Sequence, residues 1–482
     1  MMFARRLAFP TVLTTCLLAA PVLAQDSAFG GQAGADLTLE ALSPDGQAVA
    51  VGMAGETPPD IARFLLASGA SEARLAPDAS MVAYLSDVTG QPELWVVPAS
   101  GGQPRQLTFL TGVRLFRWLP DGSGLLYAAD RDGNEQEGYF RISLDGRSEA
   151  VILPAQAGDF RVFGDFAADG SFIYASTQHN GLDFDIYRAT LAGERQMVFE
   201  GRFSFTPESV SPDGRYVVVT EGVGEDANNL HLLDLAGGVL TPLSVPEPRA
   251  DHDLGGFVWL PDSSGFVFSS NAGREFGALS RYDAATGTIA VLADHGADVG
   301  EIALCGGAFA GIAYTVSRDG FDSLWFVPDS AGAGAGAAMP LGGLPEGTYS
   351  LDCPTGAGRL LVRVDGWATP GDVFVFDAPD AAPRRVFAST LAGLEPARLV
   401  RPQVVRFPAR DGVELQGLLY LPHSAPAGGP PPVLFTVHGG PSAQAQPDFD
   451  PVAQYHVARG VAVFAPNVRG STGLGRTYST LD

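Results

Sequence analysis

The chain has 482 residues, a length that suits two or three domains. Hydrophobic residues make up 46% and charged residues only 17%, which excludes a chain that is disordered throughout. All 30 basic residues are Arg, and with 54 acidic residues the net charge is −24, which argues against a nucleic-acid partner. The 60 Gly and 36 Pro favour many short strands and tight turns over a helical fold.

The first 24 residues have the pattern of a cleavable secretory signal. Arg5 and Arg6 precede an apolar stretch, and small residues precede the expected cleavage site after Ala24. This stretch is short and interrupted for a bilayer span, and no later segment reaches 18 apolar residues. We therefore expect a periplasmic or secreted protein with no membrane span after signal cleavage.

A repeat occupies most of the chain. Five Asp-containing turns recur at intervals of 43 to 49 residues, each followed by a β-rich run, and two further runs continue the phase without Asp. The turns contain Asp78, Asp121, Asp169, Asp213 and Asp262. Four strands in each interval of this length are typical of a β-propeller blade. We predict seven blades over residues 70–398, with residues 25–69 as an N-terminal extension and the aspartates as turn formers.

The last part of the chain, residues 399–482, has a different pattern. A hairpin is expected first, then a strand buried on both faces, a helix and a second buried strand. These elements are predicted at residues 404–422, 433–437, 452–459 and 461–465. Strand, helix and strand in this order predict the beginning of a parallel α/β sheet.

Three segments of this region carry a family resemblance: RDGVELQGLLYLP, VLFTVHGGP and NVRGSTGLGR. A propeller followed by these motifs resembles the prolyl oligopeptidase family of serine peptidases, and within it the bacterial acylaminoacyl-peptidase and dipeptidyl-peptidase-like branches. The resemblance covers nearly the whole chain after the signal. It implies a mainly β fold, a seven-bladed propeller followed by the N-terminal part of an α/β-hydrolase domain. It also implies an exported serine peptidase that cleaves short peptides through an acyl-enzyme, with the propeller filtering substrates.

The motif His438-Gly439-Gly440-Pro441 follows the first predicted strand of the α/β sheet. In α/β-hydrolases such a loop supplies an amide to the oxyanion hole, because a glycine backbone can approach the developing charge closely. The resemblance makes the Gly439 amide the candidate donor. Prolyl oligopeptidases proper carry a Tyr in place of His438, so that hydroxyl donor is absent here. The alternative is a tight turn with a packed His.

No Gly-x-Ser-x-Gly nucleophile motif occurs in the chain. Ser471 has Arg469 where such a motif needs Gly, so we interpret residues 469–473 as a structural turn. The family places its catalytic Ser, Asp and His further along the chain. We therefore expect the triad to lie beyond Asp482 and this chain to be inactive alone.

Two acidic residues of the second blade, Glu135 and Glu137, are candidates for holding the free amine of a peptide, as propeller acids do in relatives. A solvated hairpin is the favoured interpretation of this segment. Cys305 and Cys353 occupy equivalent places in adjacent blades, and two separate buried thiols are favoured, with a disulfide as the alternative.

No two histidines stand at the i, i+4 spacing of a zinc-binding helix, so no metal is expected, and no cofactor is implied. Short peptides are the expected partners, and the sequence predicts no particular oligomeric state. Two other functions remain open. One is a non-catalytic periplasmic propeller that binds a partner, and the other is an acyl-ester hydrolase on the same scaffold.

Overall fold

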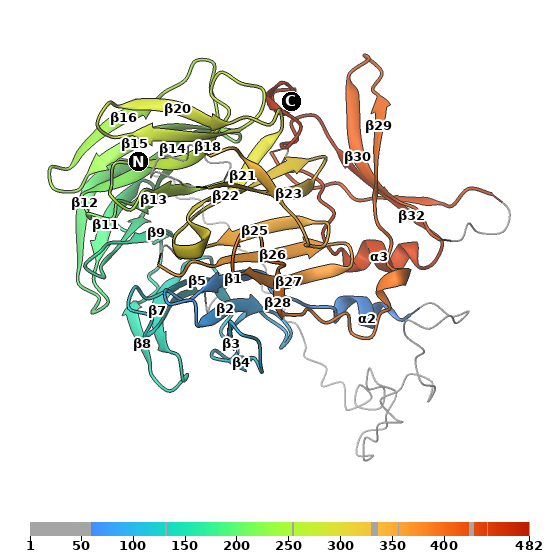
Figure 1. The fold of residues 1–482 in the computed structure, drawn as a ribbon, viewed down its shortest axis with the longest axis horizontal. Helices are drawn as coiled ribbons and strands as arrows, with labels where there is room; N and C mark the ends of the chain where they lie inside the picture. The colour runs from blue at the N-terminus through green and yellow to red at the C-terminus, as the bar shows by residue number, and fades with distance from the viewer. Residues whose placement is uncertain are drawn as a thin grey trace, which may run out of the picture. The chain divides into compact units, whose positions relative to one another are not determined.

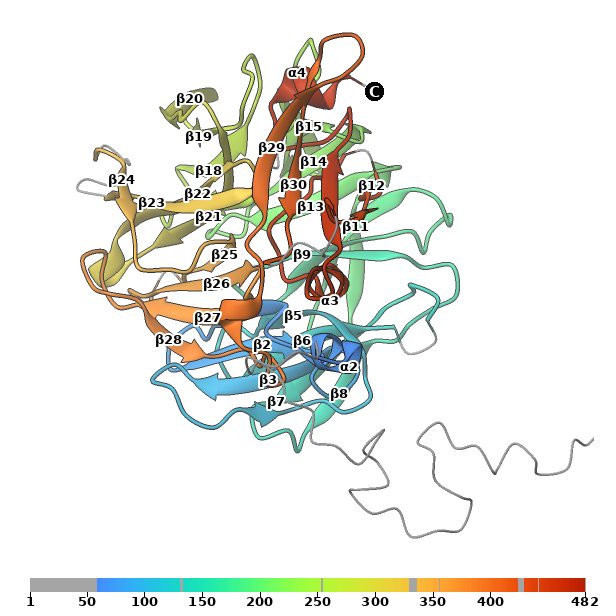
Figure 2. The same cartoon turned by 90° about the vertical axis from the view of Figure 1, so that its right-hand side faces the viewer.

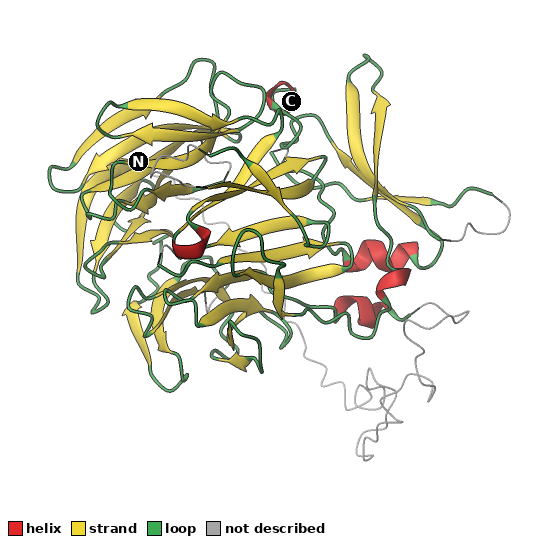
Figure 3. Cartoon of the chain, in the orientation of Figure 1, coloured by secondary structure: helices red, strands yellow, loops and turns green. Residues whose placement is uncertain are grey.

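The computed structural model describes most of the chain after the N-terminal region, and strands dominate it (Figure 3). The described ranges are 59–130, 133–252, 255–328, 336–354, 356–423, 429–440 and 442–481. The predicted signal, residues 1–24, lies outside them, as does the predicted extension up to residue 58.

Seven of the sheets have four antiparallel strands each, hydrogen-bonded in chain order (Figure 1). The first consists of β1 (Glu72–Leu75), β2 (Met81–Ser86), β3 (Glu93–Pro98) and β4 (Arg105–Gln106). The second consists of β5 (Val113–Trp118), β6 (Gly124–Ala129), β7 (Gly138–Ser143) and β8 (Glu149–Leu153). The third consists of β9 (Arg161–Phe166), β10 (Phe172–Ser176), β11 (Phe184–Ala189) and β12 (Arg195–Arg202). The fourth consists of β13 (Phe205–Val210), β14 (Tyr216–Gly224), β15 (Ala227–Asp234) and β16 (Val239–Ser244).

The remaining three sheets of this series repeat the pattern. The fifth consists of β17 (Phe257–Trp259), β18 (Gly265–Ser270), β19 (Ala278–Asp283) and β20 (Thr288–Ala293). The sixth consists of β21 (Asp298–Cys305), β22 (Gly311–Arg318), β23 (Phe321–Pro328) and β24 (Met339–Leu341), with the 3-10 turn η2 (Gly307–Phe309) between its first two strands. The seventh consists of β25 (Thr348–Asp352), β26 (Leu360–Gly366), β27 (Thr369–Phe376) and β28 (Arg384–Phe387). The predicted mainly β fold with propeller blades is confirmed.

The repeated Asp turns explain why the same hairpin forms in successive blades. In the second blade the Asp121 carboxylate accepts hydrogen bonds from the Ser123 N–H at 2.9 Å and the Ser123 hydroxyl at 2.7 Å. These bonds lower the pKa of Asp121, and the Ser123 backbone is the larger cause. The aspartate thus holds its own backbone two residues on, which is the turn chemistry that the sequence predicts.

Apolar clusters at the contacts between neighbouring sheets hold the blades together. One cluster joins the first sheet to the second through side chains such as Leu94 and Phe116, which are 0% exposed. Another joins the first sheet to the seventh, with Val82 beside Leu361 and Val375. The first and last blades are each built from their own strands, so this packing closes the series of sheets. The closure has polar support, since the Ala70 N–H donates to the Gly371 carbonyl at 2.9 Å.

A disulfide joins Cys305, at the end of β21, to Cys353, just after β25, with Cα atoms 5.4 Å apart. It links the sixth blade to the seventh, so the expectation of two separate thiols is wrong and the alternative holds. The first strands of these blades lie against each other, which brings equivalent positions within bridging distance.

The remaining sheet belongs to the C-terminal region, where β29 lies beside β30 (Figure 2), and its strand order is β29-β30-β32-β31. The 3-10 turn η3 (Pro396–Arg398) precedes it, and its strands are β29 (Gln403–Pro408), β30 (Glu414–Tyr420), β31 (Val433–Phe435) and β32 (Ala462–Asn467). The helix α3 (Pro451–Val457) connects β31 to β32, and α4 (Arg476–Ser479) follows β32. The strands β31 and β32 are parallel, as the strand–helix–strand pattern predicts.

The expected burial of residues 433–437 on both faces is wrong. Val433, Phe435 and Val437 are 51%, 62% and 60% exposed. The reason is that, among the described residues, β31 is an edge strand that pairs only with β32, and no further described strand or helix covers these alternating side chains. Apart from these elements, the described residues hold the short helix α2 (Ile61–Leu65). Among the described residues, no helix has the length and apolar character of a membrane-spanning segment.

Candidate functional site

The loop that follows β31 places two exposed backbone amides at the edge of the C-terminal sheet. Gly439 and Gly440 are both exposed. In the part of the chain that the structure describes, neither N–H donates a hydrogen bond. Gly440 has φ +117°, and a Cβ there would lie 2.8 Å from the Ser442 nitrogen, so only glycine fits. Free, exposed amides on a glycine turn can stabilise a developing oxyanion. Pro441, the last residue of the predicted motif, lies outside the described residues.

The His438 imidazole makes a hydrogen bond through each of its nitrogens. Its Nδ1 lies 3.0 Å from the carbonyl oxygen of Gly439, and its Nε2 lies 3.1 Å from the Ser471 hydroxyl. His438 and Ser471 belong to separate sequence motifs, 33 residues apart. Their side chains meet because β31 and β32, whose ends carry the two motifs, are adjacent parallel strands.

Ser471 is buried, with 0% of its surface exposed, and it forms part of a turn held from two sides. Its N–H donates to the Val468 carbonyl at 3.1 Å, and the Thr472 N–H donates to the Ala443 carbonyl at 3.0 Å. A nucleophile must reach a substrate carbonyl, and no carboxylate is paired with His438 among the described residues. These features fit a structural turn better than a nucleophile.

A cavity of about 510 Å³ lies between blades six and seven and the C-terminal region. Carboxylates are prominent in its lining, which also contains one Arg, and Thr472 and Gly473 extend it to the turn that holds Ser471. The acidic residues are Asp298, Glu301, Asp322, Asp365 and Asp448. They come from β21, β23, β26 and the segment before α3, so no local motif in the sequence reveals them.

Two of these carboxyl groups have strongly raised pKa values. Burial raises the pKa of Asp322 to about 6, opposed by the hydrogen bond from the Tyr349 N–H, whose nitrogen lies 2.9 Å away. Burial, followed by the charge of Asp365, raises the pKa of Asp448 to about 6, although the Thr348 hydroxyl donates to Asp448 at 3.0 Å. Burial removes water from each carboxyl group, and hydrogen bonds replace only part of that hydration. Both groups therefore keep their protons to a higher pH than an exposed Asp does.

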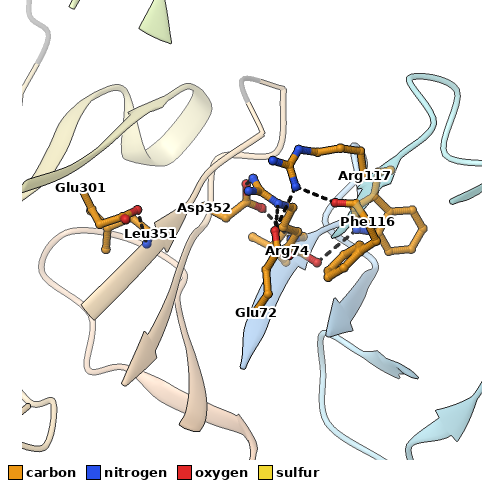
Figure 4. Close-up of polar contacts among 9 residues, drawn as sticks. Glu72, Arg74, Phe116, Arg117, Glu301, Leu351 and Asp352 are labelled. Atoms are coloured by element: carbon orange, nitrogen blue, oxygen red, sulfur yellow. Dashed lines mark hydrogen bonds and ion pairs between the residues drawn. The ribbon is translucent and has the colours of Figure 1, made fainter. Parts of the chain in front are cut away.

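The first strands of several blades carry a second cluster of charges (Figure 4). Glu72 on β1 lies 2.8 Å from Arg74 and 3.0 Å from Arg117 on β5, and Arg74 lies 3.6 Å from Asp352 on β25. Burial, with the Arg74 charge as the next cause, lowers the pKa of Arg117 to about 10. First strands of most neighbouring blades contact one another, including β1 and β25, as strands around a propeller axis do. These ion pairs therefore link blades one, two and seven near that axis.

The two candidate amine-binding acids lie in the second blade, and neither lines the cavity of 510 Å³. Glu135 is exposed and has φ +64°, and its N–H donates to Asp130 at 2.6 Å. Glu137 is partly buried, with Arg114 3.7 Å away, and burial raises its pKa. Amine binding by either residue stays a prediction.

Similar proteins were found among curated sequences and solved structures. The chain is 26% identical to dipeptidyl aminopeptidase BIII of Pseudoxanthomonas mexicana, over 84% of this chain and 60% of that protein. It is 22% identical to the uncharacterized peptidase YuxL of Bacillus subtilis, over 85% of this chain and 63% of that protein. A puromycin hydrolase crystal structure matches with a TM-score of 0.69 at 20% identity, covering 86% of this chain and 69% of that one. A prolyl endopeptidase structure matches with a TM-score of 0.71 at 15% identity, covering 87% and 64%. No protein-family model matches the chain.

These matches confirm the resemblance to prolyl oligopeptidase-family peptidases. Each match covers most of this chain but only about three-fifths of the curated relative's length. The solved structures support the fold, a propeller followed by a smaller C-terminal α/β region.

Proposed function

We propose that this protein is an exported serine peptidase of the prolyl oligopeptidase family that cleaves short peptides through an acyl-enzyme. The observation that carries the proposal is the pair of exposed amides of Gly439 and Gly440 just after β31, neither of which donates to a residue that the structure describes. A binding propeller has no use for such a loop, whereas acyl transfer needs donors aimed at the developing oxyanion. Gly439 remains the candidate donor.

The propeller is proposed to filter substrates by size. Charged side chains of the first strands are cross-linked by ion pairs near the axis, which favours a narrow opening over a wide channel. The acidic cavity beside the C-terminal region would take the peptide, because its one Arg and several carboxylates offer polar contacts to a backbone and its termini.

The catalytic Ser, Asp and His are proposed to belong to a segment outside this sequence, so that residues 25–482 alone are inactive. The absence of a nucleophile motif supports this, as do the burial of Ser471 and the uncovered apolar side chains of β31. A further strand or helix packed there would bury Val433, Phe435 and Val437.

The test compares residues 25–482 with a form extended through the downstream reading frame, using a fluorophosphonate probe and a chromogenic acyl-peptide. We expect labelling and turnover only in the extended form. Labelling of the short chain that Ser471→Ala abolishes would contradict the proposed location of the nucleophile. An extended form that takes no label would favour the binding-protein function instead.

Export is proposed from the signal pattern, with cleavage after Ala24. Amino-terminal sequencing of the protein recovered from a periplasmic extract should begin at Gln25. A protein that starts at Met1 and stays in the cytoplasm would contradict export without affecting the peptidase proposal.

A further inference from the structure

The hydrogen bonds of His438 determine which of its nitrogens carries the proton. A carbonyl oxygen only accepts hydrogen bonds, so the bond between Nδ1 and the Gly439 carbonyl, at 3.0 Å, requires a proton on Nδ1. A neutral ring then has a bare Nε2, which accepts the hydroxyl proton of Ser471 across 3.1 Å. The bonds therefore run in one direction, from the Ser471 O–H to His438 and from His438 to the Gly439 carbonyl.

Ser471 is a fixed end for this chain of bonds. It is completely buried, and the flanking turn is attached to the neighbouring segments. The Gly470 N–H donates to the Tyr478 carbonyl at 3.2 Å, and the Tyr478 hydroxyl donates to the Asn467 carbonyl at 2.7 Å. The Gly439 end, in contrast, is exposed and has no packed side chain, so its orientation depends on what binds its carbonyl.

The peptide bond is planar and trans, so the Gly440 N–H points away from the Gly439 carbonyl. A carbonyl directed at His438 therefore directs the Gly440 N–H to the opposite side, where no described residue accepts it. We propose that Ser471 and His438 are positioning residues, which orient the Gly439–Gly440 peptide and thereby preorganise the Gly440 N–H as an amide donor of the proposed oxyanion loop, beside the candidate donor Gly439. The orientation of the peptide rests on the two hydrogen bonds of His438. Its role in stabilising an oxyanion rests on the proposed function.

Electrostatic stabilisation is effective when the donors need no rearrangement during the reaction. Two successive glycines give the backbone the freedom to place its amides close to a substrate, but the same freedom makes the loop costly to order. A hydrogen bond from a buried serine through an imidazole offsets that cost without placing a side chain over the donors. This explains why a serine outside any nucleophile motif is buried against the His of the loop.

The test is nuclear magnetic resonance of the protein with ¹⁵N-labelled histidine, in which His438→Gln identifies the His438 signals among those of the seven histidines. In the unmodified protein at neutral pH we expect the Nδ1–H tautomer, with a bare Nε2. The Nε2–H tautomer would overturn the proposal, because the Gly439 carbonyl could not then accept a bond from Nδ1. This measurement needs no variant that alters the buried turn and no peptidase activity.

A second measurement tests the effect on the loop. In Ser471→Ala we expect the backbone order parameters of Gly439 and Gly440 to fall from about 0.85 to below about 0.6, the range of flexible segments. Ser442→Ala is the matched control, since Ser442 lies in the same loop and its hydroxyl bonds no described residue. Unchanged order parameters in a folded Ser471→Ala protein would also overturn the proposal. A correct tautomer with no turnover in the extended form would instead refute only the proposed function.

Discussion

The poor hydration of the acidic cavity can be tested through the carboxyl group of Asp448, whose ionisation should change the stability of the folded protein. The ordinary pKa of this group is 3.8, and burial raises it to about 6 in the folded protein. The folded state therefore binds more protons than the unfolded state between these two values. Stability is greatest below the lower value, falls as the pH rises through this window and is fully lowered above about pH 6.

The size of the effect follows from the two pKa values. At 1.36 kcal/mol for each pH unit between them, ionised Asp448 costs about 3 kcal/mol of folding free energy at pH 7. Asp448→Asn keeps the size of the side chain and an oxygen that can accept the Thr348 hydroxyl, but it removes the charge. We expect the variant to match the unmodified protein at pH 4 and to be more stable by about 3 kcal/mol at pH 7.

The assay is urea unfolding followed by tryptophan fluorescence at several pH values between 4 and 7. Asp169→Asn is a control of opposite sign, because hydrogen bonds from Ser171 lower the pKa of Asp169 to about 2. Ionised Asp169 stabilises the folded state above pH 3.8, so its Asn variant should be less stable at pH 7. If the free energies of unfolding of Asp448→Asn and the unmodified protein differ by the same amount at every pH, Asp448 does not lie in a poorly hydrated cavity.

Two further predictions concern the contacts of the seventh blade with its two neighbours. Replacing both Cys305 and Cys353 by Ala should lower the free energy of unfolding by about 4 kcal/mol, the chain-entropy value for a cross-link over 48 residues. A reducing agent should do the same to the unmodified protein and nothing to the variant; an unmodified protein indifferent to reduction would show that the bond does not stabilise it. Gly371→Ala should cost about 3 kcal/mol, because φ is +97° and a Cβ would overlap the Ala70 backbone where the first and seventh blades meet. Gly412→Ala, with φ +86° and open space around it, should cost only about 1 kcal/mol, and equal losses in both variants would contradict a role of steric overlap.

The repeat was predictable from sequence because each blade depends on a local rule. The Asp121 carboxylate binds Ser123 two residues away, and a strand follows directly, so the pattern in the chain is also the contact in the structure. The same holds for the hairpin of β29 and β30, whose turn lies at Asp411-Gly412. Features of this kind need no knowledge of distant residues.

The parts that sequence reasoning missed all depend on contacts between distant segments. Cys305 and Cys353 bond because two blades pack with their first strands together, which their spacing alone could not decide. The exposure of Phe435 depends on which strand forms the edge of the sheet. The cavity is built from single residues of several strands, each of which reads as an ordinary surface acid in its own segment.

The turn after β32 connects the loop of residues 438–440 with the acidic cavity. Ser471 holds His438, while the next two residues, Thr472 and Gly473, line the cavity. Gly473 has φ +76°, and a Cβ there would overlap the Gln444 side-chain amide, so a larger residue at this position would displace Gln444 and strain the backbone. A substitution in this turn that shifts its backbone would therefore disturb both the amide donors and the space beside them. For this reason the positioning of the loop is tested by removing only the Ser471 hydroxyl, and the cavity by neutralising only Asp448, since each change leaves the turn's backbone as it is.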